Sequence, residues 1–223
     1  MSWTDRGAIA HIKQIRDLFG VEKFIETGTF KGINAELHSK NFDIVFTCEK
    51  VKEFYYAAKK RLDKYKNVLV MNKNSKEFLR YFNDNYYKMF YLDAHFYDPK
   101  AKQKWVVIDE LKALKGHKNA IIVIHDFDNG LGHINYEGQS LNLKFIKKYL
   151  LKVNPKFHFY TNNIDSCDIV KPKRKDIKAA GLKYDKETID NLKYAQTSPR
   201  LTYRGLLYCL PMKVNIEGLR EWN

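Results

Sequence analysis

The sequence is poor in cysteine and has no long apolar run, and both absences exclude classes of protein. Its three cysteines, Cys48, Cys167 and Cys209, lie far apart and form no Cys-x-x-Cys pair. They are therefore interpreted as buried or incidental thiols of a reducing compartment rather than a disulfide framework. No run of eighteen apolar residues occurs, which argues against a transmembrane helix, and residues 1–6 lack the apolar stretch of a secretory signal. We expect a cytoplasmic protein without a membrane partner.

Acidic residues are scarce relative to basic ones. The chain has 26 Asp and Glu against 40 Lys and Arg, which gives a formal net charge of +14. Such an excess can mark a nucleic-acid partner. The lysines, however, are spread along the whole chain, with one denser run at residues 171–175, and a lysine-rich composition alone would produce the same count. The charge thus leaves a nucleic-acid partner open without favouring it.

The chain has enough apolar residues for a packed core. With 223 residues, 44% of them hydrophobic, it can bury roughly 70% of the surface of its unfolded chain. No linker or repeat divides it, so we expect one domain over residues 1–223. This domain would begin with an amphipathic helix within residues 1–20 and would carry a polar, basic insertion at residues 165–203.

Apolar strands and amphipathic helices alternate along most of the chain. Strands are predicted at residues 23–27, 44–49, 67–71, 88–93, 120–124, 156–160 and 205–210. Helices are predicted at residues 5–19, 31–40, 51–65, 75–82, 101–115 and 140–153, with Ser75 and Ser140 as N-caps. This alternation is typical of an α/β fold with a mostly parallel sheet covered on both faces. The last strand is expected to run antiparallel to its neighbours.

A glycine turn follows the first predicted strand, in the segment Glu26-Thr27-Gly28-Thr29-Phe30-Lys31-Gly32. A strand, a tight turn and a helix start form the geometry with which α/β proteins hold nucleotide-like ligands. Gly28 can take a positive φ and leaves room for a ligand. The segment is neither G-x-G-x-x-G nor a P-loop. Glu26 would repel a pyrophosphate but suits a ligand with an amino group.

Polar residues follow the other predicted strands as well. Glu49 ends the second strand, 21 residues after Gly28, where a carboxylate can accept two hydrogen bonds from the ribose of NAD or of an adenosyl ligand. Further polar pairs stand after the third, fourth and fifth strands: Asn74-Ser75, Asp93 with His95, and His125-Asp126. Each alone is explained by capping or a turn. Together, at one edge of a parallel sheet, they predict a ligand site.

On these motifs the sequence resembles class I S-adenosylmethionine-dependent methyltransferases. Glu26 to Gly32 is similar to that family's E-x-G-x-x-x-G motif, and Glu49 stands at the place of its ribose-binding acid. The resemblance covers most of the chain and implies a Rossmann-like seven-stranded sheet of order 3-2-1-4-5-7-6. It also implies S-adenosylmethionine as the cofactor. The implied cofactor-binding residues are Glu26, Thr27, Gly28, Thr29, Gly32, Glu49, Lys50, Asn74, Ser75 and Asp93.

Within that family, Leu92-Asp93-Ala94-His95 and Ile124-His125-Asp126 are similar to the metal-dependent macrocin O-methyltransferase and cephalosporin hydroxylase-like group. The resemblance implies that Asp93 and Asp126 hold a divalent ion such as Mg²⁺ or Mn²⁺, with His125 where an acid is usual. Imidazole suits Mn²⁺, Fe²⁺ or Zn²⁺ better than Mg²⁺. Asp128 as a further ligand, or a site without metal, stays open.

Two residues are candidates for the chemistry itself. Asp93 and His95 are the candidate catalytic residues, because an imidazole with an ordinary pKa near 6.5 suits removal of a proton from a hydroxyl. The alternative is a purely structural role, in which His95 packs beside the aromatic residues that follow it.

The sequence thus predicts methyl transfer to a hydroxyl of a small molecule or glycan. The alternatives are an RNA methyltransferase that uses the basic surface, a binding domain without turnover, and an NAD-dependent dehydrogenase. The oligomeric state stays open.

Overall fold

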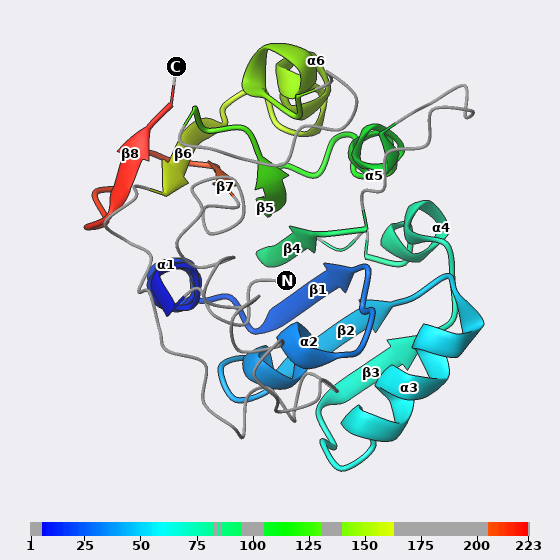
Figure 1. Ribbon diagram of the computed structural model, residues 1–223. Helices are drawn as coiled ribbons and strands as arrows, with labels where there is room; N and C mark the ends of the chain where they lie inside the picture. Colours follow the sequence, from blue (N-terminus) through cyan, green and yellow to red (C-terminus); the bar gives the residue numbers. More distant parts are fainter. Residues whose placement is uncertain are drawn as a thin grey trace, which may run out of the picture.

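The computed structural model describes residues 6–82, 84, 86–94, 105–130, 140–162 and 205–222 (Figure 1). The predicted helix and strand order is confirmed in these residues. The helices are α1 (Arg6–Phe19), α2 (Ile33–His38), α3 (Lys52–Leu62), α4 (Ser75–Leu79), α5 (Val106–Ala113) and α6 (Leu143–Val153). The strands are β1 (Lys23–Thr27), β2 (Ile44–Cys48), β3 (Val68–Met71), β4 (Lys88–Leu92), β5 (Ala120–Phe127), β6 (His158–Asn162), β7 (Gly205–Leu210) and β8 (Leu219–Glu221). The predicted insertion at 165–203 lies outside the described residues.

The strands form one sheet of order β3-β2-β1-β4-β5-β7-β6-β8. Strands β1 to β5 pair in parallel, whereas β7 runs antiparallel to both β5 and β6. The predicted order of seven strands is therefore confirmed. The predicted number of strands was too low by one, because β8 adds an eighth strand antiparallel to β6. Its three residues, Leu219–Glu221, are partly or fully exposed and too few to show an alternating pattern.

Apolar side chains leave the sheet on both faces, and helices cover each face. One buried cluster joins α4, α5 and α6 and includes Leu111 of α5 and Ile146 of α6. A second cluster joins α1, α2 and α3 and includes Ile12 of α1 and Ala58 of α3. Figure 1 shows these two sets of helices on opposite sides of the sheet. Burying each such large aliphatic side chain contributes about 1.5–3 kcal/mol. The two packed faces leave the edge at the strands' carboxyl ends for polar groups.

The N-caps of α4 and α6 differ from the prediction by one and two residues. Asn74, not Ser75, caps α4, since its side chain accepts a hydrogen bond from the N–H of Lys76 at 2.9 Å. Asn142, not Ser140, caps α6 in the same way, through the N–H of Phe145 at 3.0 Å. Asn and Ser are about equally good caps, so composition alone did not separate them.

In the part of the chain that the structure describes, no helix is long and apolar enough to cross a membrane.

Candidate functional site

The Gly28 turn joins the carboxyl ends of three strands. The N–H groups of Gly28 and Thr29 both donate to the carbonyl of Cys48 at 3.0 Å, which ties the turn to the end of β2. Gly28 has φ of 80°, and a Cβ there would lie 2.6 Å from the carbonyl oxygen of Asp93 at the end of β4. Glycine is thus required by the neighbouring backbone as well as by its φ. The turn holds the ends of β1, β2 and β4 close together.

Glu26 is buried at the end of β1 with its carboxylate held by two side chains. Asn34 Nδ2 donates to one oxygen at 2.8 Å and Thr47 Oγ1 donates to the other at 2.6 Å. Thr47 also shares a hydrogen bond of 2.5 Å with the hydroxyl of Thr29. Burial outweighs these hydrogen bonds and raises the pKa of Glu26 to about 8. Near neutral pH this carboxyl is mostly protonated, and a nearby cation would favour its ionised form.

Glu49 lies just beyond β2, and backbone groups orient its carboxylate. The N–H of Phe30 donates to Oε2 at 2.9 Å, and the N–H of Val51 donates to Oε1 at 2.8 Å. A carboxylate has about four acceptor positions, so each oxygen can take one more hydrogen bond. Two free acceptor positions on a fixed carboxylate match the two hydroxyls of a ribose. The geometry therefore fits the role that the sequence predicts for Glu49.

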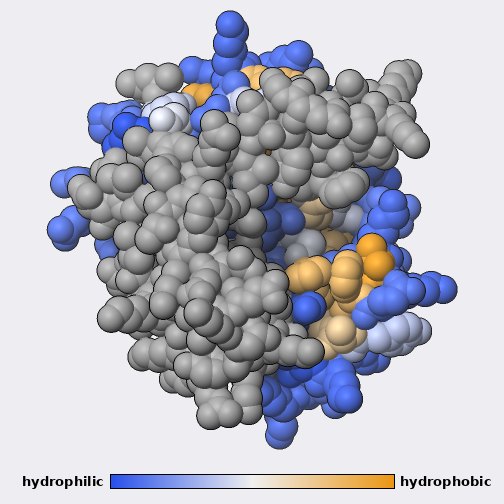
Figure 2. Space-filling model, in the orientation of Figure 1, coloured by the Kyte–Doolittle hydropathy of each residue, from blue (hydrophilic) through white to orange (hydrophobic). Residues whose placement is uncertain are grey.

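An apolar rim flanks Glu49. Phe30 and Val51, whose N–H groups hold the carboxylate, expose 37% and 44% of their surface. The ring of Phe30 contacts the ring of Phe54 edge-on, with 4.6 Å between the ring centroids. Phe30 takes this place with a positive φ of 48°, which is uncommon for a large side chain. Figure 2 shows an apolar patch beside a hollow on the face of the molecule drawn there.

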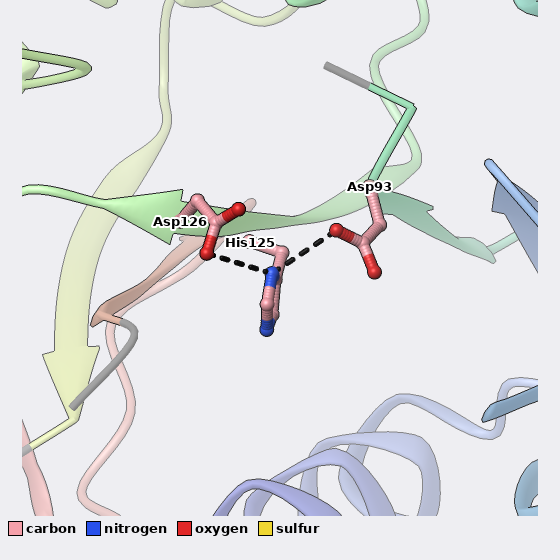
Figure 3. A group of neighbouring side chains, drawn as sticks. All are labelled: Asp93, His125 and Asp126. Atoms are coloured by element: carbon pink, nitrogen blue, oxygen red, sulfur yellow. Dashed lines mark ion pairs between the residues drawn. The ribbon is translucent and has the colours of Figure 1, made fainter. Parts of the chain in front are cut away.

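Asp93, His125 and Asp126 form a compact cluster at the ends of β4 and β5 (Figure 3). The Nδ1 atom of His125 lies 3.0 Å from Asp93 Oδ1 and 3.3 Å from Asp126 Oδ1. Successive side chains of a regular strand point to opposite faces, yet those of His125 and Asp126 meet. A one-residue shift in the pairing of β5 with β7, between Ile124 and Phe127, and the positive φ of Asp126, 53°, make this possible.

This cluster is electrostatically coupled. Burial disfavours a charged imidazole, but the carboxylates of Asp93 and Asp126 outweigh burial and raise the pKa of His125 to about 9. Burial likewise opposes ionisation of Asp93, while the charge of His125 and its hydrogen bond lower the pKa of Asp93 below its usual range. Three potential ligand atoms lie within 4.8 Å of one another. Ligands of one divalent ion are roughly 3–5 Å apart, so the donor set fits such an ion.

Comparison with known proteins reveals the same fold. No protein-family model and no curated protein matches the sequence. Solved structures do match: a candidate caffeoyl-CoA O-methyltransferase from Staphylococcus aureus has a TM-score of 0.52 and 21% identity, covering 92% of this chain and 83% of its own. A candidate O-methyltransferase from Klebsiella pneumoniae has a TM-score of 0.53 and 9% identity, and the match covers 92% of this chain and 80% of the Klebsiella chain. Phosphoethanolamine N-methyltransferase 2 from Haemonchus contortus, solved with S-adenosyl-L-methionine, has a TM-score of 0.51 and 14% identity, with coverages of 90% and 51%.

The chain has the class I methyltransferase fold.

Several positions that the resemblance to methyltransferases implied have other partners in the structure. The side chain of Asn74 is exposed and caps α4, and Ser75 is buried as the first residue of that helix. Lys50 is exposed, and its carbonyl accepts a hydrogen bond from Asn72 at 3.2 Å. Thr27 is fully buried, and its backbone and hydroxyl oxygens accept from the N–H of Asp93. These residues shape the edge of the sheet around Gly28 and Glu49.

Sequence reasoning missed a buried acid under this edge. Glu110 of α5 is fully buried, and among the described residues neither of its carboxyl oxygens has a partner with hydrogen-bonding geometry. Burial raises its pKa to about 7, although the hydroxyls of Thr27 and Ser75 lie near enough to oppose this. The signal in the sequence was an acid on the apolar face of an amphipathic helix, four residues after Val106.

One further candidate ligand, Asp128, does not join the cluster in the described structure. Asp128 accepts hydrogen bonds from the hydroxyl of Ser140 and, at 3.0 Å, from the N–H of Gly130, so it fastens the loop after β5. His95, the candidate base, lies outside the described residues. The metal hypothesis thus depends on Asp93, His125 and Asp126.

Proposed function

We propose that this chain is an S-adenosylmethionine-dependent methyltransferase that transfers a methyl group to a hydroxyl of a small molecule or sugar. The observation that carries the proposal is the carboxylate of Glu49. It is fixed by the N–H groups of Phe30 and Val51, and among the described residues one acceptor position on each oxygen stays unused. It lies beside the Gly28 turn in a sheet with the strand order and fold of methyltransferases.

The residues around Glu49 suit the rest of the cofactor. Glu26 lies behind the same turn, close enough to Glu49 for the charge of the Glu49 carboxylate to add to the raised pKa of Glu26. A ligand with a positively charged amino group would offset this repulsion, whereas a pyrophosphate would add to it. The apolar rim of Phe30, Val51 and Phe54 offers rings and a branched side chain beside the ribose position. These features favour an adenosyl amino acid over NAD.

The cluster of Asp93, His125 and Asp126 supports a hydroxyl as the acceptor. Its two carboxylates and imidazole fit a divalent ion of the Mn²⁺ kind. Such an ion, when bound, would stabilise the negative charge that develops on the acceptor oxygen. The residues of this chain would hold the acceptor in line with the methyl group and exclude water. His95, two residues after Asp93 in the sequence, is our candidate for the base that takes the hydroxyl proton.

Binding of S-adenosylhomocysteine, measured by titration calorimetry, tests the donor site. We expect the native chain to bind it and Glu49→Ala to bind it about ten- to a hundredfold more weakly, the scale for leaving ribose hydroxyls unpaired, about 1–3 kcal/mol. Glu53→Ala removes an exposed carboxylate four residues on, in the first turn of α3, and should change affinity less than twofold. Binding of NAD without any binding of S-adenosylhomocysteine would exclude the proposal.

Mn²⁺ binding, followed by electron paramagnetic resonance, tests the cluster separately. Loss of one carboxylate ligand in Asp126→Asn should weaken Mn²⁺ binding at least tenfold, because a neutral amide replaces a charged ligand. Asp128→Asn is the matched control, since Asp128 binds Ser140 and Gly130 instead. If the native chain transfers methyl groups at an undiminished rate in EDTA, the metal is not needed, and a metal-free mechanism with His95 replaces it.

Transfer of tritium from methyl-labelled S-adenosylmethionine to a panel of vicinal diols, hexoses and RNA then distinguishes the acceptor classes. Labelling of RNA alone would contradict the small-molecule proposal.

A further inference from the structure

Lysines of two segments, residues 115–118 and 144–156, lie on or directly after the helices α5 and α6, which cover the same side of the sheet. We call this the lysine face, and its side chains are all exposed; they are Lys115, Lys118, Lys144, Lys147, Lys148, Lys152 and Lys156. The C-terminal ends of α5 and α6 bring these segments together. The N–H of Gly116 donates to the carbonyl of Lys152 at 3.1 Å, and Asn154 Nδ2 donates to the carbonyl of Lys118 at 2.8 Å. Figure 1 shows α5 and α6 as neighbours on one side of the sheet.

Acidic residues do not balance this face. From residue 111 to 162 the described acids are Asp126 and Asp128, which lie at the other end of β5. Asp109 pairs with Lys112 at 3.1 Å, and none of the seven lysines has an ion pair with an acid in the described chain. By contrast, Arg61 of α3 and Lys64, two residues after the end of α3, pair with Glu36. In the described chain the seven lysines of the lysine face thus form a group of positive charges without acidic partners.

Helix stability does not account for this arrangement. Cations in the last turn of a helix are favoured by the helix dipole, and Lys152 of α6 benefits from it. Lys144, however, stands in the first turn of α6, where a cation is unfavourable, and that turn has no acid. Lys144, Lys148 and Lys152 also follow one another at intervals of four residues, about 6 Å along the helix. This regular row of unpaired charges is complementary to a chain of phosphates.

We propose that the lysine face binds the phosphate backbone of single-stranded nucleic acid. The row on α6 matches one strand, and Phe145, 37% exposed on the same helix, offers a ring on which a base can stack. An anionic membrane is the less suitable partner, because attachment to a bilayer needs a broad apolar face beside the charges, and the large apolar side chains of α6 are mostly buried in the core.

The dense end of the lysine face, at Lys115, Lys118, Lys152 and Lys156, lies apart from the proposed site of methyl transfer. Lys118 precedes β5, whereas Asp126 stands near its other end, and the eight residues of that strand extend over about 23 Å. Nucleic acid bound at the dense end of the lysine face, at Lys115, Lys118, Lys152 and Lys156, would therefore tether the protein without filling the methyltransferase site. The proposal does not depend on which molecule accepts the methyl group.

Fluorescence anisotropy with a fluorescein-labelled 20-nucleotide oligouridylate, measured over a series of KCl concentrations, tests the proposal on the full chain. The test variant carries Lys115→Gln, Lys118→Gln, Lys152→Gln and Lys156→Gln. Its affinity at 100 mM KCl should fall at least tenfold. The slope of log K against log salt should become shallower by about 2–3, because each lost phosphate contact on a single strand removes about 0.7.

A matched variant with Lys40→Gln, Lys59→Gln, Lys60→Gln and Lys66→Gln removes the same charge from exposed positions elsewhere. Its slope of log K against log salt should differ from that of the native chain by no more than about one. The four Lys→Arg replacements on the lysine face should retain binding, which separates charge from shape. Equal losses in both Gln variants would overturn the proposal, because net charge alone would then explain binding. So would binding to phosphatidylserine vesicles without binding to the oligouridylate. Binding of S-adenosylhomocysteine by each variant reports the methyltransferase site independently.

Discussion

The buried carboxyl of Glu26 gives the strongest test of the site's electrostatics. Its pKa is raised from an ordinary value of 4.5 to about 8, mainly by burial. Between these pH values the folded chain keeps a proton on Glu26 that the unfolded chain has lost. The free energy of unfolding must therefore fall as pH rises through this window. Replacement by Gln mimics the protonated carboxyl, keeps its size and removes the titration.

The expected magnitude follows from the two pKa values. A difference of one in pKa is equivalent to about 1.4 kcal/mol, so Glu26→Gln should gain about 4 kcal/mol relative to the native chain between pH 5 and pH 8. At pH 5 the two proteins should differ by less than about 1 kcal/mol, because this pH is only half a unit above the ordinary pKa of 4.5 that Glu26 has when unfolded. Asn34 and Thr47 remain beside the side chain at this position in either protein.

Urea unfolding, followed by circular dichroism at half-unit steps from pH 5 to pH 8, measures the difference. Glu22→Gln is the control, since Glu22 is exposed at the start of β1 and its loss changes the net charge equally. The free energies of unfolding of Glu22→Gln and of the native chain should differ little at every pH from 5 to 8. A difference for Glu26→Gln that is flat with pH would show that Glu26 is already ionised in the fold, and the account of its burial would be wrong.

Two further predictions concern the same edge of the sheet. Gly28→Ala should destabilise the fold by more than about 2 kcal/mol, because the new Cβ would lie 2.6 Å from the backbone of Asp93 and the residue would also have to keep a left-handed conformation. Gly20→Ala is the control: its φ is 60° but no atom lies near its Cβ, so it should cost only about 1–2 kcal/mol in the same urea titration. Equal effects of the two replacements would contradict the steric argument. Glu110→Gln should change the free energy of unfolding little at pH 5 and should raise it by about 2–3 kcal/mol at pH 8. The reason is that the pKa of Glu110, raised to about 7, makes its ionisation at higher pH costly to the fold. A loss of stability at pH 8 would show that Thr27 and Ser75 need the carboxylate.

The apolar pattern was sufficient to predict most of the sheet. The limits of β1 and β7 agree with the prediction: β7 is an almost continuous apolar run, and β1 leads directly into the Gly28 turn. The residues at the strand ends, Glu49 and Asp126 among them, come together because parallel strands of one sheet share a carboxyl edge. This inference needs only the order of the elements and no knowledge of contacts.

What the sequence could not predict depends on contacts between distant segments. The donors that fix Glu49 are backbone N–H groups, which nearly every residue has, so no residue type signals them. The meeting of His125 and Asp126 on one side of β5 needs an irregular pairing with β7, more than 75 residues further on. Glu110 is an acid in an amphipathic helix, and its depth in the core becomes visible only when α5 is packed on the sheet. The local pattern indicates at most that Glu110 lies on the apolar face of its helix, and it does not predict the other two contacts.

The short last strand affects how much of the sheet edge is open to pairing with another chain. Without β8, the hydrogen-bonding edge of β6 would be open, and an open edge can pair with another chain. β8 covers it with only three residues, Leu219–Glu221, two of which are charged. The next residue, Trp222, packs its ring against Phe127, and Arg220 donates to the carbonyl of Asn129 at 2.8 Å. The strand that shields the sheet from other copies is therefore also anchored to the segment that follows the Asp126 cluster, so damage to one is expected to reach the other.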